Sequence, residues 1–189
     1  GSEVNLEVLW SSRDIVDNDL NNVSIVLRLS FTGQGEDASF LFTGDAEHFV
    51  EDHLVQTLGA RLRTKVLKAA HHGSNSSTTD AFLRAVRPEH VVITVGNQTF
   101  SNTALPREET FQRIQTVSDD LSLGTQVWRT DRGDKTPVMK PIGTETEDDA
   151  VVARTDGRTI QINYADQAGT APVPAVVDRC QAITGSGTQ

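Results

Sequence analysis

The chain changes its hydrophobic period close to Asp45, and this change most constrains the fold. Before it, "VSIVLRLSF" (23–31) and "ASFLFTGD" (38–45) combine alternating or continuous apolar residues with β-branched and aromatic side chains, which is typical of strands. After it, apolar residues recur at helical spacing through residues 46–58, and Gly59 follows as a stop signal. The two strands are therefore predicted to pair antiparallel and to lead directly into a helix.

The next part of the chain alternates strand and helix patterns. Strands are expected over residues 64–70, 90–96 and 125–131, and helices over 77–86 and 105–117. Two antiparallel strands followed by strand–helix alternation predict an α/β (α+β) chain with a mixed sheet and helices on one face.

A shift in composition divides the chain near residue 134. Residues 1–134 are expected to form one folded unit, 135–157 a polar, acidic linker or insertion, 158–164 a final strand and 165–189 a flexible tail. The chain opens with Gly-Ser and lacks an initiator Met, so we expect a piece excised from a longer protein.

Charge and composition exclude several classes of function. The net charge is −9, which argues against a broad DNA-binding surface, because neutralising phosphates requires clustered Lys and Arg. Arg61, Arg63, Lys65 and Lys68 form a local basic cluster that is read as a solvated edge, with a local basic site as the alternative. The single cysteine, Cys180, rules out an internal disulfide and a cysteine-based zinc cluster. No apolar run approaches the length of about 20 residues that a membrane-spanning helix needs.

Polar residues that could carry chemistry follow two of the expected strands. Asp45 ends "FLFTGD", and His71 and His72 end "VLKAAHHGS". Carboxylate and imidazole side chains are common metal ligands, and strand ends of α/β sheets collect ligand sites. Asp45 could instead cap the following helix, and the histidines could be polar turn residues. Adjacent side chains on an extended segment point apart, so one imidazole would face a metal and the other would orient it or a substrate.

The order of these segments resembles the C-terminal half of a metallo-β-lactamase-fold hydrolase of the ComEC-type competence branch. The resemblance rests on "NNVSIVLRLSF", "FLFTGDAE", "VLKAAHHGSNSST", "RPEHVVITVGNQ" and "TQVWRTDRGD" in this order. It implies an αββα sandwich that holds zinc or manganese, with two ions in the complete parent, and that hydrolyses phosphodiester or nucleic-acid substrates. It also implies that Asp45 bridges the metals and that either His71 or His72 is a metal ligand.

The chain departs from this family in two ways. It lacks the His-x-His-x-Asp-His ligand run of the N-terminal half, and it lacks the Gly-His-Pro turn after "ITVGN". His48 and His53 fall on a predicted helix with the wrong spacing and are expected to be solvated, while His90 is expected to be structural or at the surface. The chain supplies one candidate carboxylate and one or two candidate imidazoles, whereas a catalytic zinc site needs about three protein ligands and a site for two ions needs more, so the chain alone is predicted to bind metal weakly and to be inactive.

The leading hypothesis is therefore the C-terminal part of a metal-dependent hydrolase, completed by its missing N-terminal half or by a complementing chain. A homodimer is also considered, because half a sandwich would expose an apolar sheet face. The main alternative is a non-catalytic pseudo-hydrolase scaffold or protein-interaction module, and a further one is an unrelated α/β domain. The predicted location is cytoplasmic, or extracytoplasmic if the parent is a competence-type membrane protein.

Overall fold

The computed structural model describes residues 3–15, 17–32, 38–96, 99–100, 103–131, 150–157 and 159–164. The expected acidic segment up to residue 149 and the expected tail over 165–189 lie outside these residues. Within the described part, no helix is both long and apolar enough to cross a membrane.

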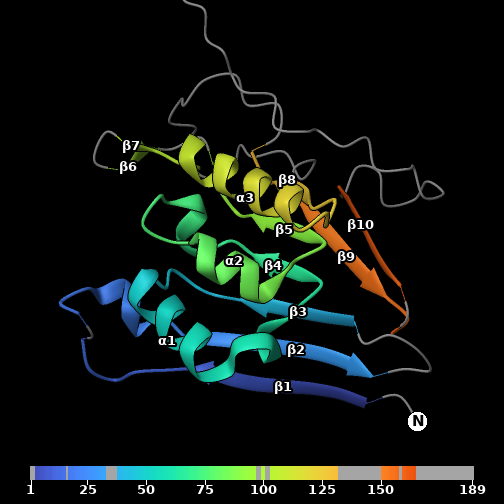
Figure 1. Cartoon of the computed structure of the whole chain (residues 1–189), viewed down its shortest axis with the longest axis horizontal. Helices are drawn as coiled ribbons and strands as arrows, with labels where there is room; N and C mark the ends of the chain where they lie inside the picture. The colour runs from blue at the N-terminus through green and yellow to red at the C-terminus, as the bar shows by residue number, and fades with distance from the viewer. Residues whose placement is uncertain are drawn as a thin grey trace, which may run out of the picture.

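The central element is a mixed six-stranded sheet in the order β1-β2-β3-β4-β5-β8 (Figure 1). Its strands are β1 (Glu3–Trp10), β2 (Val26–Thr32), β3 (Ala38–Phe42), β4 (Val66–Lys68), β5 (His90–Ile93) and β8 (Gln126–Arg129). The first three strands pair antiparallel, and β3, β4, β5 and β8 pair parallel. The predicted mixed sheet and the predicted antiparallel pairing of its second and third strands are confirmed.

Three α-helices lie together over one face of the sheet in the described part of the chain (Figure 1). They are α1 (His48–Leu58), α2 (Asp80–Val86) and α3 (Glu108–Asp120). Short 3-10 turns precede or follow the strands at η1 (Leu20–Val23), η2 (Gly59–Leu62) and η3 (Ala70–Gly73), and β6 (Thr99–Phe100) pairs with β7 (Thr103–Ala104). The mixed α/β class and the placement of helices on one face agree with the sequence prediction.

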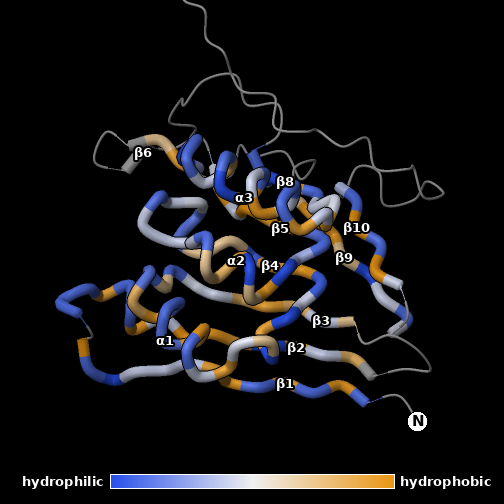
Figure 2. Tube along the Cα trace, viewed as in Figure 1, coloured by the Kyte–Doolittle hydropathy of each residue, from blue (hydrophilic) through white to orange (hydrophobic). Residues whose placement is uncertain are grey.

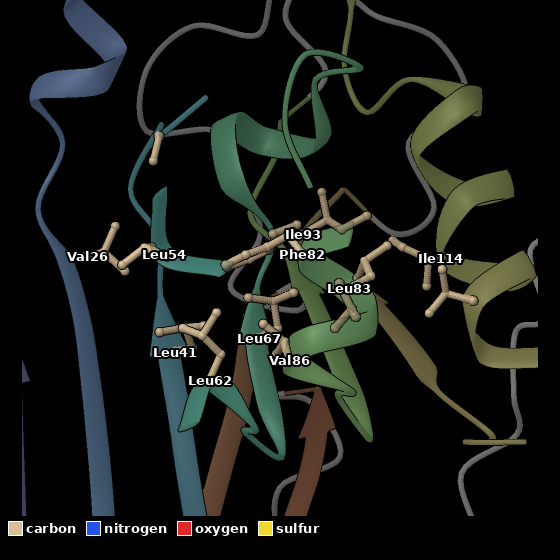
Figure 3. Packing of buried hydrophobic residues seen from close by; sticks show 14 of the residues in the cluster. Val26, Leu41, Leu54, Leu62, Leu67, Phe82, Leu83, Val86, Ile93 and Ile114 are labelled. Carbon is tan, nitrogen blue, oxygen red and sulfur yellow. The ribbon is translucent and has the colours of Figure 1, made fainter. Parts of the chain in front are cut away.

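The main hydrophobic core fills the space between the helices and the sheet (Figure 3). Leu41, Leu67 and Val91 point to it from three neighbouring strands, and Leu54 and Phe82 reach it from α1 and α2. All five side chains are at most 1% exposed. Burying a side chain of this size stabilises the fold by about 1.5–3 kcal/mol, so this core fixes how the strand ends are placed.

A second cluster covers part of the opposite face. Strands β9 (Val151–Thr155) and β10 (Ile160–Tyr164) form an antiparallel hairpin whose Ile162 packs against Val66 and Trp128. The expected strand over 158–164 corresponds to β10. The strand β9 was not expected, because residues 135–157 were interpreted as a linker or insertion. Its two valines carry too short an apolar signal to predict a strand without the hairpin partner.

The remaining part of that face is apolar and uncovered by any described element. Val4, Leu6 and Val8 of β1 are 63%, 61% and 61% exposed, and in Figure 2 hydrophobic and hydrophilic colours alternate along this strand. Through the strand register, Leu6 lies opposite Leu29, which lies opposite Phe40, so all share the face that points away from the helices. Phe40 itself packs in the second cluster, so we call Val4, Leu6, Val8, Leu27, Leu29, Phe31 and Phe42 the open apolar face.

Candidate functional site

The ends of strands β3 and β4 bring the sequence-predicted residues to one edge of the sheet. Asp45 follows β3, and His71 and His72 lie in the turn η3 just after β4. Since β3 and β4 are parallel neighbours, their carboxyl ends meet, and the backbone N–H of His71 donates a 3.2 Å hydrogen bond to the carbonyl of Gly44. The two turns therefore lie side by side, as the sequence predicts.

His72 is the histidine that faces Asp45. Its Nε2 lies 3.4 Å from Asp45 Oδ1, and its Nδ1 lies 2.5 Å from the carbonyl oxygen of Thr94. A carbonyl oxygen only accepts, so Nδ1 carries the hydrogen of this bond. In the neutral imidazole, Nε2 then presents a lone pair toward a carboxylate oxygen. These two acceptors repel each other unless a proton or a cation lies between them.

Asp45 is positioned by the segment before β2. Its backbone N–H donates a 3.0 Å hydrogen bond to Ser24 Oγ, and a Cβ on Gly44 would come within 3.0 Å of the same serine. Gly44 also has a φ of +58°, a conformation that favours glycine. The residue at the N-cap position of α1 is Glu47, so the interpretation of Asp45 as a helix cap is wrong.

His71 faces a different carboxylate, which sequence reasoning missed. His71 Nδ1 lies 2.5 Å from Glu47 Oε1, which also accepts a 3.3 Å hydrogen bond from Asn21 Nδ2. The Glu47 side chain is only 5% exposed, and its backbone N–H donates to Asn22 Oδ1. Glu47 Oε2 has no hydrogen-bond partner among the described residues. The available signal was Glu47 two positions after Asp45, in "TGDAE", together with the "NN" pair upstream.

The histidine turn has an unusual backbone. His71, His72 and Gly73 have φ values of 43°, 53° and 80°, all in the left-handed region. This conformation costs roughly 1–2 kcal/mol for each residue other than glycine, so neighbouring groups must hold it. The Gly73 carbonyl accepts hydrogen bonds from the backbone N–H of Arg107 and from Thr110 Oγ1, both 2.9 Å. The chain around the start of α3 thus supports the turn.

Lys68 is the one member of the predicted basic cluster that reaches this edge. Its Nζ lies 3.8 Å from Asp45 Oδ1 and donates a 2.8 Å hydrogen bond to the carbonyl of Gly44. Burial lowers the pKa of Lys68, and the charge of Asp45 opposes this shift. A cation is therefore already next to the carboxylate.

The other histidines are not part of the edge. His48 and His53 are exposed on α1, with the His53 ring against Trp10, which confirms that they are solvated helix residues. His90 Nδ1 accepts a 3.3 Å hydrogen bond from Trp128 Nε1, and burial lowers the pKa of His90, so its role is structural.

The donor geometry partly fits a divalent metal. Two ligands at 2.0–2.2 Å from one tetrahedral ion lie roughly 3.3–3.6 Å apart, which matches the 3.4 Å between His72 Nε2 and Asp45 Oδ1. Within the described residues, however, no group of three or more His, Cys, Asp or Glu side chains could hold a metal ion. This chain thus presents a pair of donors with suitable separation, one donor short of a catalytic zinc site.

Comparison with known proteins gives partial matches. No family model matches the chain. It is 42% identical to the competence protein ComA of Neisseria gonorrhoeae over 78 residues, which is 41% of this chain and 11% of that protein. It is 30% identical to ComE operon protein 3 of Bacillus subtilis over 96 residues, 50% of this chain and 11% of that protein. A third match, at 43% identity over 58 residues, is Recombination protein 2 of Haemophilus influenzae, with 31% of this chain and 7% of that protein covered.

The chain is similar to one part of competence proteins. The matched stretch spans about a tenth of the length of these relatives. The competence branch of the predicted resemblance is therefore supported at the level of a fragment.

Proposed function

We propose that this chain is the C-terminal part of a metal-dependent hydrolase with the metallo-β-lactamase fold, and that the parent acts on phosphodiester or nucleic-acid substrate. The 3.4 Å approach of His72 Nε2 to Asp45 Oδ1 at the shared edge of β3 and β4 carries the proposal. The similarity to competence proteins, which are much longer, supports both the family and the status as a part.

In this proposal, Asp45 and His72 are the metal ligands that the chain contributes. The Thr94 carbonyl orients the His72 ring by taking its Nδ1–H, which is the usual arrangement behind a metal-binding imidazole. His71 is assigned to orienting the turn, because its Nδ1 is held by the buried Glu47. A bound zinc or manganese ion would lower the pKa of a coordinated water toward neutrality, and the parent would hold two such ions. The remaining ligands would come from its other half.

The open apolar face supports completion by another part of the parent. Its exposed β1 residues are separated by strand β2 from Phe40, which packs in the cluster beneath the β9–β10 hairpin. A second sheet laid on this face would continue that cluster and form the sandwich that the family resemblance implies. The N-terminal half or a complementing chain is thus the proposed partner, with a homodimer as the competing arrangement. The location follows that of the parent, extracytoplasmic for a competence-type membrane protein and cytoplasmic otherwise.

A non-catalytic scaffold is the second candidate, and Lys68 favours it. An ammonium group 3.8 Å from Asp45 Oδ1 supplies positive charge where a metal would otherwise supply it. A protein that keeps the fold for interaction could use Lys68 and His72 to neutralise Asp45 without a metal ion.

Metal analysis of the purified parent tests the leading proposal. Asp45→Asn and His72→Ala should each lose bound metal, while His48→Ala, the matched control on an exposed helix position, should retain it. Hydrolysis of bis(p-nitrophenyl) phosphate should fall together with the metal content. If both site variants keep the full metal content, the ligand assignment is wrong. If the parent contains no metal and hydrolyses nothing, the scaffold function replaces the hydrolase.

A further inference from the structure

Two side chains from different helices form hydrogen bonds with the backbone of the segment that follows the histidines. Glu51 of α1 accepts the backbone N–H of Thr78 at Oε1 (2.6 Å) and that of Thr79 at Oε2 (2.8 Å). Arg113 of α3 donates from Nη1 to the carbonyls of Ser77 (2.7 Å) and Thr78 (3.0 Å). Glu51 thus takes the N–H groups and Arg113 takes the carbonyls of the same short stretch of backbone.

Arg113 also forms a hydrogen bond nearer the start of the same segment. Its Nη2 donates a 3.2 Å hydrogen bond to the carbonyl of Asn75. Thr78 has a φ of 52°, so its backbone is in the left-handed region that a β-branched residue adopts at a cost. The hydrogen bonds that Arg113 donates are charge-assisted and about twice as strong as neutral ones, which helps to hold this conformation.

The segment held by Glu51 and Arg113 is hydrogen-bonded to Ala70, the residue before the histidines. Thr78 Oγ1 accepts a 3.1 Å hydrogen bond from the backbone N–H of Ala70, and Ser77 Oγ donates a 3.0 Å hydrogen bond to the carbonyl of Ala70. Ala70 precedes His71 and is 1% exposed. Both backbone groups of Ala70 are therefore fixed by side chains whose own backbone is fixed by Glu51 and Arg113.

Burying the Glu51 side chain at this position costs free energy. The residue is 1% exposed, and removing a carboxylate from water costs free energy unless its oxygens are hydrogen-bonded. Both oxygens accept backbone N–H groups of the loop, so the compensating hydrogen bonds come from the loop. A residue needed only to fill the core would be apolar here.

We propose that Glu51 and Arg113 are positioning residues that act as a pair on the histidine turn and set the direction in which His72 points toward Asp45. Only the expected effect on metal binding rests on the proposed function of this edge. Its structural content, the control of the His72 ring by two remote side chains, stands without a metal.

NMR of the imidazole nitrogens in the 189-residue chain tests that content without metal. The wild type should show His72 as a single Nδ1–H tautomer, because Thr94 accepts that proton. In Glu51→Gln and Arg113→Met, His72 should shift toward the Nε2–H tautomer, because the hydrogen bond from Nδ1 to the Thr94 carbonyl weakens. The His90 ring accepts a hydrogen bond from Trp128 at the start of β5, and its signal reports whether each variant is folded.

The control variant is Arg84→Met on α2. Among the described residues, Arg84 forms ion pairs with Asp80 and Asp120 and has no hydrogen bond or ion pair to the histidine loop, so its removal should leave the His72 tautomer unchanged. If Glu51→Gln and Arg113→Met keep the wild-type His90 signal and the wild-type His72 tautomer, the proposal is overturned. If Arg113→Met loses the His90 signal, Arg113→Lys replaces it in the test. Lysine keeps the charge but lacks the forked geometry, so the His72 tautomer should change if the proposal holds and stay as in the wild type if it fails.

Metal binding by the parent provides the second readout. Arg113→Lys and Glu51→Gln should weaken binding of Zn²⁺ by at least about tenfold, as is usual for residues that orient a ligand. If Asp45→Asn leaves Zn²⁺ binding intact, the proposed function fails even when the His72 tautomer changes as expected. If Asp45→Asn abolishes binding and the two positioning variants bind like the wild type, the positioning role fails and the proposed function stands.

Discussion

Replacing Glu51 with glutamine should remove a defined part of the pH dependence of folding stability. Burial raises the pKa of Glu51 from its ordinary value of 4.5 to about 7, while hydrogen bonds from Thr79 and Thr78 and the charge of Arg113 act in the opposite direction. The folded chain therefore binds a proton at this position more tightly than the unfolded chain does. Protonated Glu51 therefore contributes to the free energy of unfolding. This contribution is fully present below pH 4.5 and is lost as the pH rises through about 7.

The size of this contribution to the free energy of unfolding follows from the pKa of Glu51 in the unfolded chain and in the folded chain. One pKa unit corresponds to 1.36 kcal/mol, so ionising Glu51 in the fold costs up to about 3 kcal/mol. Between pH 5.5 and pH 8.5, the linkage relation predicts that Glu51 alone lowers the free energy of unfolding by about 2 kcal/mol. Glutamine keeps one acceptor oxygen and cannot ionise, so the variant should lack this decrease.

Urea denaturation of the wild type and of Glu51→Gln at several pH values measures the difference. Subtracting the two free energies of unfolding at each pH cancels the other titrating groups that both proteins share. The wild type should lose about 2 kcal/mol relative to the variant between pH 5.5 and pH 8.5. A difference that stays flat, or that grows in favour of the wild type as the pH rises, would refute the reasoning, because Glu51 would then be stabilised in its charged form.

Three further perturbations test other parts of the structure. Gly73→Ala places a Cβ 2.5 Å from the Pro106 side chain at a φ of +80°, so the free energy of unfolding should fall by about 2 kcal/mol or more in urea titrations, whereas Gly124→Ala, at a φ of +65° with nothing within 4 Å, should cost less. Lys68→Met removes the cation beside Asp45 and should tighten Zn²⁺ binding to the chain in a calorimetric titration; weaker binding would show that the ammonium group does not compete with metal. Leu6→Ser on the open apolar face should change stability by less than about 0.5 kcal/mol but reduce self-association in sedimentation velocity, and unchanged association would count against this face as the contact.

The sequence alone determined the order of elements and the edge at which the candidate residues meet. Hydrophobic periodicity is a local property, so the strand before Asp45 and the strand before His71 could both be recognised without the fold. Parallel neighbouring strands place their carboxyl ends at one edge, which is why the approach of these two turns was predictable. The strand β9 escaped prediction because its stability depends on pairing with β10 and packing beneath the sheet.

Only the tertiary structure decided which histidine faces Asp45. The left-handed turn at His71 and His72 sends one ring to the buried Glu47 and the other to Asp45, and no periodic pattern encodes such a turn. The same is true of Glu51, whose helix position shows no sign that a loop 27 residues later supplies its hydrogen bonds. Contacts between side chains and distant backbone groups arise from packing in three dimensions, because burial and backbone direction, rather than residue type, determine which polar groups meet.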